Sequence, residues 1–423
     1  MKKKALCAVL AGLMAMGCVS PVFAETTENE EVTITMMIGN DQDTTGLDAV
    51  FALAEEKLGI HVEVENRVDE TVLKTRLASG DATDIVVYNS GALLAAQNPA
   101  DYYLPLNDYP EITDRLDDTY EECVTVDGMT YGVPLGSGNI GCILYWKPMY
   151  EELGLEIPKT WDEFIANCET IKNSGYNAVL SADAKTSSTQ LIFLGDYYNV
   201  LAEDPTFTEE FEAGRAKYAT NEAAFKSWQK YEDVLPYLQD GHEACGLEDG
   251  YDIFASGESA HWIYFTSILP SMYDLYGAEV TDNIGLFAIP GDDSENTGLT
   301  IWQPESLYIN KDSENIEACL KFVEFYISDE ALDAYNTAMS PEGVSCIKGY
   351  ETKSIYSAVS DAQIYFDEGR TAPAQEFVTA VKGPNCRSFT GGILAGLYSA
   401  KEAAELYDED CKLQAIQLGL DWE

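Results

Sequence analysis

Segments with the pattern of strands and of helices alternate along the first part of this chain. Apolar runs of strand length occur at residues 32–38, 60–64 and 85–88, and segments of helical spacing at residues 47–58 and 71–77 lie between them. Strands that are joined through helices in this way pair in parallel, and the helices cover the sheet. The alternation therefore predicts an α/β fold with a mostly parallel sheet.

The chain is long enough for more than one domain, yet nothing in it resembles a linker. With 423 residues, of which 46% are hydrophobic, it suits two or three domains at roughly 100 to 200 residues each. We find no internal repeat and no stretch rich in Gly, Ser or Pro that would separate domains. If there are two domains, we expect the chain to cross between them several times.

The charge of the chain is strongly negative. Its 73 Asp and Glu outnumber 25 Lys and Arg, which gives a formal net charge of −48. Nucleic acids and anionic bilayers are held by basic patches, so this balance argues against both classes of partner. We expect no nucleic-acid partner.

Residues 1–24 have the pattern of an export signal. Three lysines at positions 2–4 precede an apolar run, which ends in the small-residue sequence Val22-Phe23-Ala24. The run is shorter than the roughly 20 residues that span a bilayer. We expect an exported protein, in the periplasm or on the outer face of the cell membrane. Cleavage after Ala24 is one outcome, and lipidation at Cys18, which follows a degraded lipobox, is the other.

The spacing of apolar residues near Trp161 predicts a helix that packs into the core. Thr160 and Glu163 have the spacing of a capping box, and the apolar stripe that begins at Trp161 and continues to Ile171 predicts a buried helix face. Beyond the leader, eight scattered cysteines include no CxxC pair. We expect them to be buried free thiols.

No pattern in the sequence predicts catalysis or a metal centre. The three histidines are far apart, and Ser345-x-x-Lys348 lacks the partner motifs of the enzymes that use it. A loop that starts like a calcium site at Asp41 has Ala52 where the bidentate Glu is required. The sequence thus predicts no catalytic residue, no metal and no cofactor. A glycosidase needs only two suitably spaced carboxylates, so that class stays open.

Eight segments follow one another along the chain: LASGDATD (77–84), VDGMTYGVP (126–134), LYWKPMYEELGL (144–155), IPKTWDEF (157–164), IFASGESAHW (253–262), NIGLFAIPG (283–291), SLYINKDSENIEACLKFVEFYISDEA (306–331) and ILAGLYSAKEAAELYDED (393–410). Taken in this order, they resemble the family 1 extracellular solute-binding proteins of bacterial ABC importers, the group that includes maltose-binding protein. The resemblance covers essentially the whole chain beyond the leader. It departs from the family at Trp146-Lys147, where Tyr-Asn-Lys is usual.

The resemblance implies a two-lobed periplasmic-binding-protein-like fold with mixed, mostly parallel sheets, a hinge of several crossing segments and a ligand held between the lobes. It implies crossings near residues 136–142, 284–290 and 338–344. The expected N-terminal lobe then comprises residues 25–138 and 290–338, and the C-terminal lobe residues 142–284 and 344–423. It also implies a monomeric receptor that delivers a carbohydrate to membrane permease subunits.

Ligands of α/β sheets bind beyond the carboxyl ends of the strands, so the residues that follow each expected strand are the candidates for binding. Aromatic rings stack on sugar faces, while amides, carboxylates and guanidinium groups bind hydroxyls. This chemistry favours a sugar, and among sugars an oligosaccharide. The candidate residues are Asn40, Asp41, Tyr88, Asn89, Ser90, Asn139, Tyr264, Phe265, Ser267, Trp302, Gln303 and Glu305. The resemblance adds Arg387, which lies in a late segment that often completes the pocket in this family.

Three alternatives remain open from the sequence. Acidic and aromatic residues also form cation cages, so a polyamine or other cation receptor of the same fold is the first. A pocket with two or more unpaired carboxylates would favour it. A secreted glycosidase is the second, and a sensor subunit that reports to a membrane kinase is the third.

Overall fold

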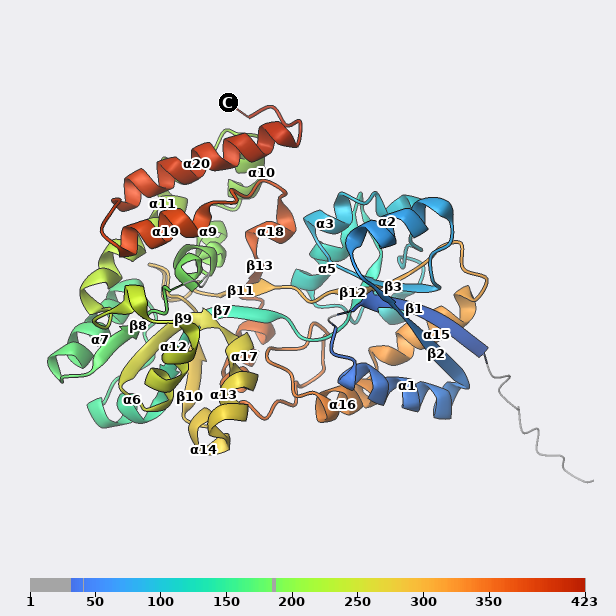
Figure 1. Cartoon of the computed structure of the whole chain (residues 1–423), viewed down its shortest axis with the longest axis horizontal. Coiled ribbons are helices and arrows are strands. Elements are labelled where there is room, and N and C mark those ends of the chain that lie inside the picture. Colours follow the sequence, from blue (N-terminus) through green and yellow to red (C-terminus); the bar gives the residue numbers. More distant parts are fainter. Residues whose placement is uncertain (1–31, 41, 185–187, 423) are drawn as a thin grey trace, which may run out of the picture. The chain divides into compact units, whose positions relative to one another are not determined.

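Two mixed β-sheets organise residues 32–40, 42–184 and 188–422, which are the residues that the computed structural model describes (Figure 1). The predicted signal segment and Cys18 lie outside these residues, as does Asp41. A two-stranded ribbon is formed by β4 (Thr125–Val126) and β5 (Met129–Thr130).

The first sheet has the order β2-β1-β3-β12-β6. β1 (Val32–Gly39) is parallel to β2 (Ile60–Arg67) and to β3 (Ile85–Tyr88), as the alternation of strands and helices predicts. β12 (Ser306–Ile309) is antiparallel to β3 and to β6 (Gly132–Pro134). This sheet and its helices form the first lobe.

The second sheet has the order β13-β11-β7-β9-β8, with β10 also paired to β7. Its central strand β7 is antiparallel to β9, β10 and β11, whereas β8 pairs with β9 in parallel and β13 pairs with β11 in parallel. This sheet and its helices form the second lobe. The strands are β7 (Asn139–Trp146), β8 (Asn177–Leu180), β9 (Ser259–Phe265), β10 (Ile284–Phe287), β11 (Leu299–Trp302) and β13 (Thr371–Pro373).

Both sheets are mixed, as expected, but parallel pairing does not predominate in them. The reason is that β7 and β12 enter their sheets directly from the other lobe. A strand–helix–strand unit within one sheet makes its strands parallel, whereas a strand that enters from the other lobe need not be parallel to its neighbours. Local alternation therefore predicts the β1-β2-β3 part of the first sheet and overestimates parallel pairing elsewhere.

Three segments connect the two sheets: residues 135–138 between β6 and β7, residues 303–305 between β11 and β12, and residues 339–356 between α16 and α17. We call these the first, second and third crossings. The expected crossing at residues 284–290 is wrong, because β10 stays in the second sheet beside β7. β11 also belongs to the second sheet, although the expected boundary at residue 290 placed it in the first lobe.

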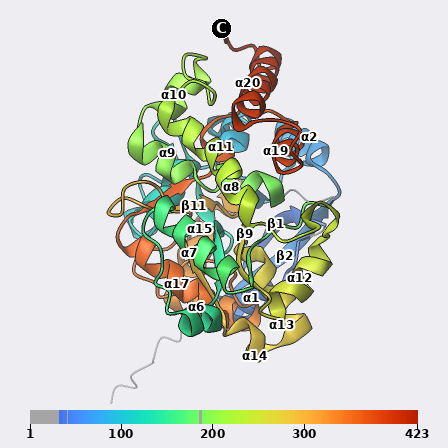
Figure 2. The same ribbon diagram turned by 90° about the vertical axis from the view of Figure 1, so that its left-hand side faces the viewer.

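Helices cover both sheets. In the first lobe, α1 packs against α15 and α16, and these three lie on one side of the sheet with α2, α3 and α5 on the other (Figure 1). In the second lobe, α11, α19 and α20 pack together at one end, while α13, α14 and α17 lie at the other (Figure 2). The α-helices are α1 (Thr45–Leu58), α2 (Glu70–Ser79), α3 (Ala92–Ala95), α4 (Pro110–Thr113), α5 (Asp118–Val124), α6 (Lys147–Leu153), α7 (Trp161–Asn173), α8 (Leu191–Leu194), α9 (Tyr197–Glu203), α10 (Phe207–Glu212), α11 (Glu222–Val234), α12 (Leu247–Ala255), α13 (Leu269–Tyr276), α14 (Ala278–Thr281), α15 (Ile316–Tyr326), α16 (Asp329–Ala338), α17 (Ser357–Asp367), α18 (Gln375–Val378), α19 (Cys386–Leu394) and α20 (Ala400–Gln417).

The start of α7 shows how local sequence fixes an element. The Thr160 side chain accepts a hydrogen bond from the Glu163 amide at 3.3 Å, which confirms the predicted N-cap. The Glu163 carboxylate accepts from the Lys159 amide at 2.7 Å instead of completing a reciprocal box at Thr160. In the predicted stripe, Trp161, Phe164, Cys168 and Ile171 are buried, and Ile165 is half-buried.

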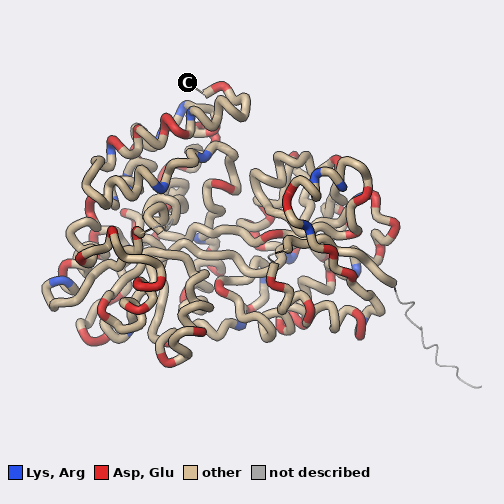
Figure 3. The backbone as a smooth tube through the Cα atoms, in the orientation of Figure 1, with Lys and Arg blue, Asp and Glu red and all other residues tan. Residues whose placement is uncertain are grey.

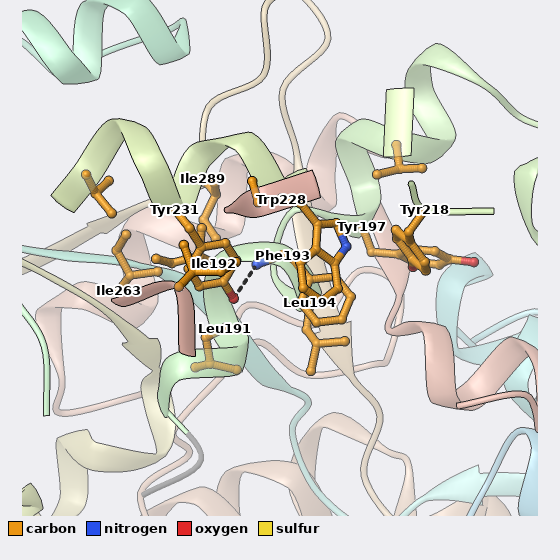
Figure 4. Packing of buried hydrophobic residues seen from close by; sticks show 14 of the residues in the cluster. Leu191, Ile192, Phe193, Leu194, Tyr197, Tyr218, Trp228, Tyr231, Ile263 and Ile289 are labelled. Carbon is orange, nitrogen blue, oxygen red and sulfur yellow. Dashed lines mark hydrogen bonds between the residues drawn. The ribbon is translucent and has the colours of Figure 1, made fainter. Parts of the chain in front are cut away.

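The core of the second lobe is rich in aromatic side chains (Figure 4). Phe193 packs against Trp228 with ring centroids 4.7 Å apart, and its amide donates to the Tyr231 hydroxyl at 3.4 Å. The first lobe has a separate core of mainly aliphatic residues from β1, β3 and α1. The eight cysteines of the described chain are buried and free, as predicted.

Candidate functional site

The carboxyl ends of three parallel strands lie side by side at one edge of the first sheet. β1 ends at Gly39, which is paired in register with Arg67 at the end of β2, and β3 ends at Tyr88. The Asn40 amide donates to the Arg67 carbonyl at 3.1 Å. Residues that follow these strands are therefore gathered where parallel α/β sheets bind ligands.

This edge borders a cavity of about 510 Å³, which we call the strand-end hollow. It contains one basic side chain and four acidic ones. Its volume lies within the range of small-molecule sites. Its lining residues are Gly39, Asn40, Gln42, Asp43, Arg67, Val68, Asp69, Glu70 and Glu305.

A second cavity of about 560 Å³ adjoins it, and we call this the hinge hollow. The two cavities share Gln42, Asp43 and Glu305. All three crossings contribute to the hinge hollow, so its shape depends on both lobes. Its lining residues are Gln42, Asp43, Thr45, Leu135, Gly136, Ser137, Pro270, Asp274, Pro304, Glu305, Tyr335, Ala338, Met339, Ser340, Pro341, Glu342 and Tyr356.

Arg67 is held firmly in the wall of the strand-end hollow. Its side chain is 5% exposed, and its Nη1 donates to the Val87 carbonyl at 2.7 Å. Its Nη2 lies 3.3 Å from Glu70 Oε1 and 3.8 Å from Glu305 Oε1. Burial raises the pKa of the neighbouring Tyr88, and the charge of Glu70 adds to the shift. Arg67 thus links the end of the first-lobe sheet to the second crossing.

Four carboxylates and two tyrosines line the hinge hollow. Burial raises the pKa of Glu342, so its environment disfavours the charged form. Burial also raises the pKa of Tyr335 to about 12, with smaller contributions from the charges of Asp43 and Glu342. Hydrogen bonds from Thr45 lower the pKa of the more exposed Asp43. The hinge hollow therefore combines tyrosine rings with two kinds of carboxylate: Glu342, whose charged form is disfavoured, and Asp43, whose charged form is favoured.

The second lobe brings an aromatic group together at the carboxyl ends of β9 and β11. The rings of Phe265 and Trp302 meet edge to face at 4.7 Å, and Tyr264 packs beside Phe265 at 6.0 Å. Asn139 is paired with Trp302 in register, and its Oδ1 accepts from the Ser267 amide at 3.1 Å and from Thr266 Oγ1 at 3.2 Å. We call Tyr264, Phe265 and Trp302 the aromatic group.

Helix α18 connects the aromatic group to the first lobe. Trp302 Nε1 donates to Glu376 at 3.1 Å, and Glu376 is ion-paired with Lys382. The next residue, Phe377, packs against Gly91, which has φ 67° and follows the predicted site residue Ser90. A Cβ at Gly91 would lie 2.4 Å from the Phe377 carbonyl oxygen, so this approach requires glycine.

Comparison with known proteins places the chain in a family. A model of the family described as bacterial extracellular solute-binding protein matches residues 49–351, which is most of the chain. The chain belongs to this family. The solute-binding protein is 24% identical over 307 residues to the multiple sugar-binding protein of Streptococcus mutans, with 70% of each chain covered.

Solved structures of the same fold are similar to this solute-binding protein over nearly its whole length. The apo form of RafE from Streptococcus pneumoniae has a TM-score of 0.76 at 21% identity, with 90% of this chain and 98% of RafE covered. RafE in complex with raffinose has a TM-score of 0.67, with coverage of 90% and 100%. These similarities show the two-lobed fold and its hinge of crossing segments.

The residues predicted for binding fall into three sets in the solute-binding protein. Asn40 and Glu305 line the strand-end hollow, Tyr88 ends the adjoining strand β3, and Asn89 and Ser90 follow it. The aromatic group lies with Asn139 and Ser267 at the second sheet. The remaining predicted residues are separate from both sets: Gln303 is buried beside Cys346 and Arg387 is exposed in the first turn of α19.

Sequence reasoning missed several residues that line the cavities. Arg67 was missed because the expected strand ended at Val64, whereas β2 continues to Arg67. Extending the strand by three residues would have placed Arg67 among the candidates. Tyr335 and Glu342 come from α16 and the third crossing, and no local signal places them beside Asp43.

The described residues include no group of three or more His, Cys, Asp or Glu side chains that could hold a metal ion. His242 Nδ1 is 2.6 Å from Asp183 Oδ2, and His261 is buried with its ring bonded to the Tyr150 hydroxyl at 2.7 Å. Lys348 of the SxxK string pairs with Asp118 at 2.5 Å. Among the described helices, none has the length and apolar character needed to cross a membrane.

Proposed function

We propose that this solute-binding protein is the exported receptor that delivers a carbohydrate, and specifically an oligosaccharide, to an ABC importer. The observation that carries the proposal is the pair of adjoining cavities of about 510 and 560 Å³ at the crossings. Together they have room for more than one sugar ring. The names of the relatives, multiple sugar-binding protein and RafE with raffinose, support the same ligand class.

The polar lining of the cavities suits hydroxyl groups. Carboxylate and amide oxygens of Asn40, Asp43 and Glu305 accept hydrogen bonds, and the Arg67 guanidinium donates them. Rings of the aromatic group would stack on the C–H faces of a sugar when the lobes close. We propose these residues, with Tyr88, Asn89, Ser90, Asn139, Ser267 and Arg387, as the binding set.

Binding in this proposal is non-covalent and is coupled to lobe closure. Micromolar affinity corresponds to about −8 kcal/mol, which a few stacked rings and hydrogen bonds reach once water is excluded. Closure would join surfaces of both lobes into one face for the permease, which would then distinguish loaded from empty receptor. We expect a monomer, with either cleavage after Ala24 or a lipid anchor at Cys18.

A thermal-shift screen against mono- and oligosaccharides tests the proposal. At a thousandfold excess over Kd, a ligand adds about 4 kcal/mol of stability and raises Tm by roughly 5 °C. We expect a shift from an oligosaccharide that is recovered intact. Release of reducing ends over time would instead show a glycosidase, and no shift from any sugar would refute the carbohydrate assignment.

A cationic solute is the second candidate, and the charges that line the cavities favour it. Six carboxylates, those of Asp43, Asp69, Glu70, Asp274, Glu305 and Glu342, face a single guanidinium, that of Arg67. Such a lining attracts ammonium groups, and tyrosine faces add cation–π attraction. The same screen with spermidine and putrescine separates the candidates, because only a cation receptor gives a shift that 0.5 M salt abolishes.

A further inference from the structure

The three crossings meet at one buried point. The Gly138 amide of the first crossing donates to the Val344 carbonyl of the third at 3.3 Å, and Ser137 and Ser345 form a β-bridge beside it. The Cys346 thiol of the third crossing donates to Gln303 Oε1 of the second at 3.5 Å. The Leu135 amide of the first crossing donates to the Glu305 carbonyl of the second at 2.8 Å. Each crossing is thus bonded to the others.

Gly138 and Gly343 let their neighbours come this close because they have no side chain. Neither adopts a backbone conformation that requires glycine. A Cβ on Gly343 would lie 1.7 Å from the carbonyl oxygen of Gly138, and neither glycine has a positive φ. A Cβ on Gly138 would lie 2.6 Å from the Ile301 Cγ2 methyl of β11. The absence of a side chain at Gly343 therefore sets how closely the first and third crossings approach, and its absence at Gly138 sets how closely the first crossing approaches β11.

The groups around this contact are buried away from the cavities. Cys346 is 1% exposed and Gln303 is 7% exposed. Burial raises the pKa of the Cys346 thiol, which keeps it protonated as the donor to Gln303. Gln303 was expected to bind ligand, but its Oε1 is engaged by this thiol. Gly136 and Ser137, however, line the hinge hollow directly beside the contact.

We propose that the contact between Gly138 and Gly343, with the Cys346–Gln303 hydrogen bond, is the pivot that sets the spacing of the lobes and tunes ligand affinity without touching ligand. This rests on the proposed function for its ligand. The affinity of a two-lobed receptor equals its intrinsic affinity multiplied by the fraction of molecules that can close. A side chain at residue 343 would force the crossings apart and lower that fraction.

The experiment compares Gly343→Ala, Gly138→Ala and the control Gly246→Ala. Gly246 precedes α12 in the second lobe, has no positive φ, and has Asp249 Oδ2 at 3.4 Å as the nearest atom to an added Cβ. Spin labels at Asp81→Cys and Asp162→Cys, one exposed site on each lobe, report the distance between the lobes in the absence of ligand. Cys7 and Cys18 are replaced by Ser, and the buried thiols stay unlabelled.

We expect Gly343→Ala to shift the inter-lobe distance and to weaken binding of the sugar found in the screen at least tenfold. Gly138→Ala should cause a smaller change. Its added Cβ meets the Ile301 methyl group, which can move aside more easily than the backbone carbonyl that the Gly343→Ala side chain meets. Gly246→Ala should cause neither.

A folded Gly343→Ala protein with unchanged inter-lobe distance and unchanged affinity overturns the pivot. If no sugar binds the wild-type protein, the carbohydrate assignment fails, while the distance measurement still decides the pivot. If Gly343→Ala does not fold, Gly138→Ala decides it by the same criteria.

Discussion

The two lobes bring different chemistry to the site. The first lobe presents charged groups at the ends of parallel strands, with Arg67 anchored among carboxylates. The second lobe presents the aromatic group, in which Trp302 is oriented by its hydrogen bond to Glu376. Charged groups fix the direction of hydroxyls, whereas rings supply contact area with little directional demand. From this difference we propose that the first lobe determines which ligand is held and that the second lobe contributes to how tightly.

Acidic residues are distributed over both lobes and do not distinguish them (Figure 3). Two carboxylates, one in each lobe, show how the local environment shifts a pKa in opposite directions. Burial raises the pKa of Asp408 in α20 of the second lobe to about 6, and this outweighs its hydrogen bonds from the Ala219 and Tyr218 amides. Burial also acts to raise the pKa of Asp84 in the first lobe, but hydrogen bonds from Ser313 and Thr35 outweigh it and the pKa is lowered.

The largest expected effect is that of Arg67→Ala. Removing the guanidinium leaves the Val87 carbonyl without its donor and the carboxylates of Glu70 and Glu305 without their shared cation. We expect a loss of about 3 kcal/mol in the free energy of unfolding and a loss of ligand binding. Urea denaturation and calorimetric titration measure the two.

The matched control for Arg67→Ala is Arg76→Ala. Arg76 pairs with Glu65 at 2.5 Å but is more exposed than Arg67, and it does not line either hollow. Arg76→Ala should lower the free energy of unfolding by no more than about 1 kcal/mol and leave the ligand affinity unchanged. Equal effects of the two substitutions would show that Arg67 has no special role in the first lobe.

The buried Asp408 and the half-buried Asp84 should respond to acid in opposite directions. Folded Asp408 gains its proton below about pH 6, while the unfolded chain gains it below about 3.8, so its contribution to stability rises by about 2 kcal/mol as pH falls from 6 to 4. Asp84 has a lowered pKa, so its contribution is present near neutral pH and is lost in stronger acid.

Substitution separates these contributions. Asp408→Asn should flatten the rise in stability between pH 6 and pH 4, and Asp84→Asn should destabilise the protein at pH 7 with a deficit that shrinks below pH 4. Urea denaturation at intervals of one pH unit measures both profiles. Parallel profiles for the two variants and the wild-type protein would contradict the opposite pKa shifts of Asp408 and Asp84.

Trp302→Leu tests the contribution of the second lobe to affinity. Leucine preserves apolar bulk but removes the ring face and the hydrogen bond to Glu376. We expect about tenfold weaker sugar binding, equal to about 1.4 kcal/mol, with ligand preference unchanged. Trp146→Leu is the control, because Trp146 packs against Phe254 at the other end of β7. If Trp302→Leu alters which sugar binds best, the division of roles between the lobes is wrong.

The sequence predicts local features well and non-local ones poorly. The N-cap at Thr160 and the buried stripe of α7 depend on residues within a few turns, and both were predicted. The pairing of β10 and β11 with β7 depends on strands more than 130 residues away, so the second crossing was misplaced. The hinge hollow was missed for the same reason, since Asp43 and Glu342 meet only through the packing of α1 against α16 and the third crossing.

The smallest expected effect is that of Glu342→Gln on the affinity for neutral and cationic ligands. It tests whether the hinge hollow also helps to select the ligand. Glu342 has a raised pKa from burial, so Glu342→Gln removes a costly buried charge and should leave stability equal or slightly higher. A neutral oligosaccharide should bind within about threefold of the wild-type affinity, because Gln still accepts a hydrogen bond. A polyamine should bind several-fold more weakly, because one carboxylate is lost. Asp312→Asn, outside both hollows, is the control. Equal weakening of both ligands would mean that Glu342 contacts hydroxyls directly, and the first lobe would then share selection with the third crossing.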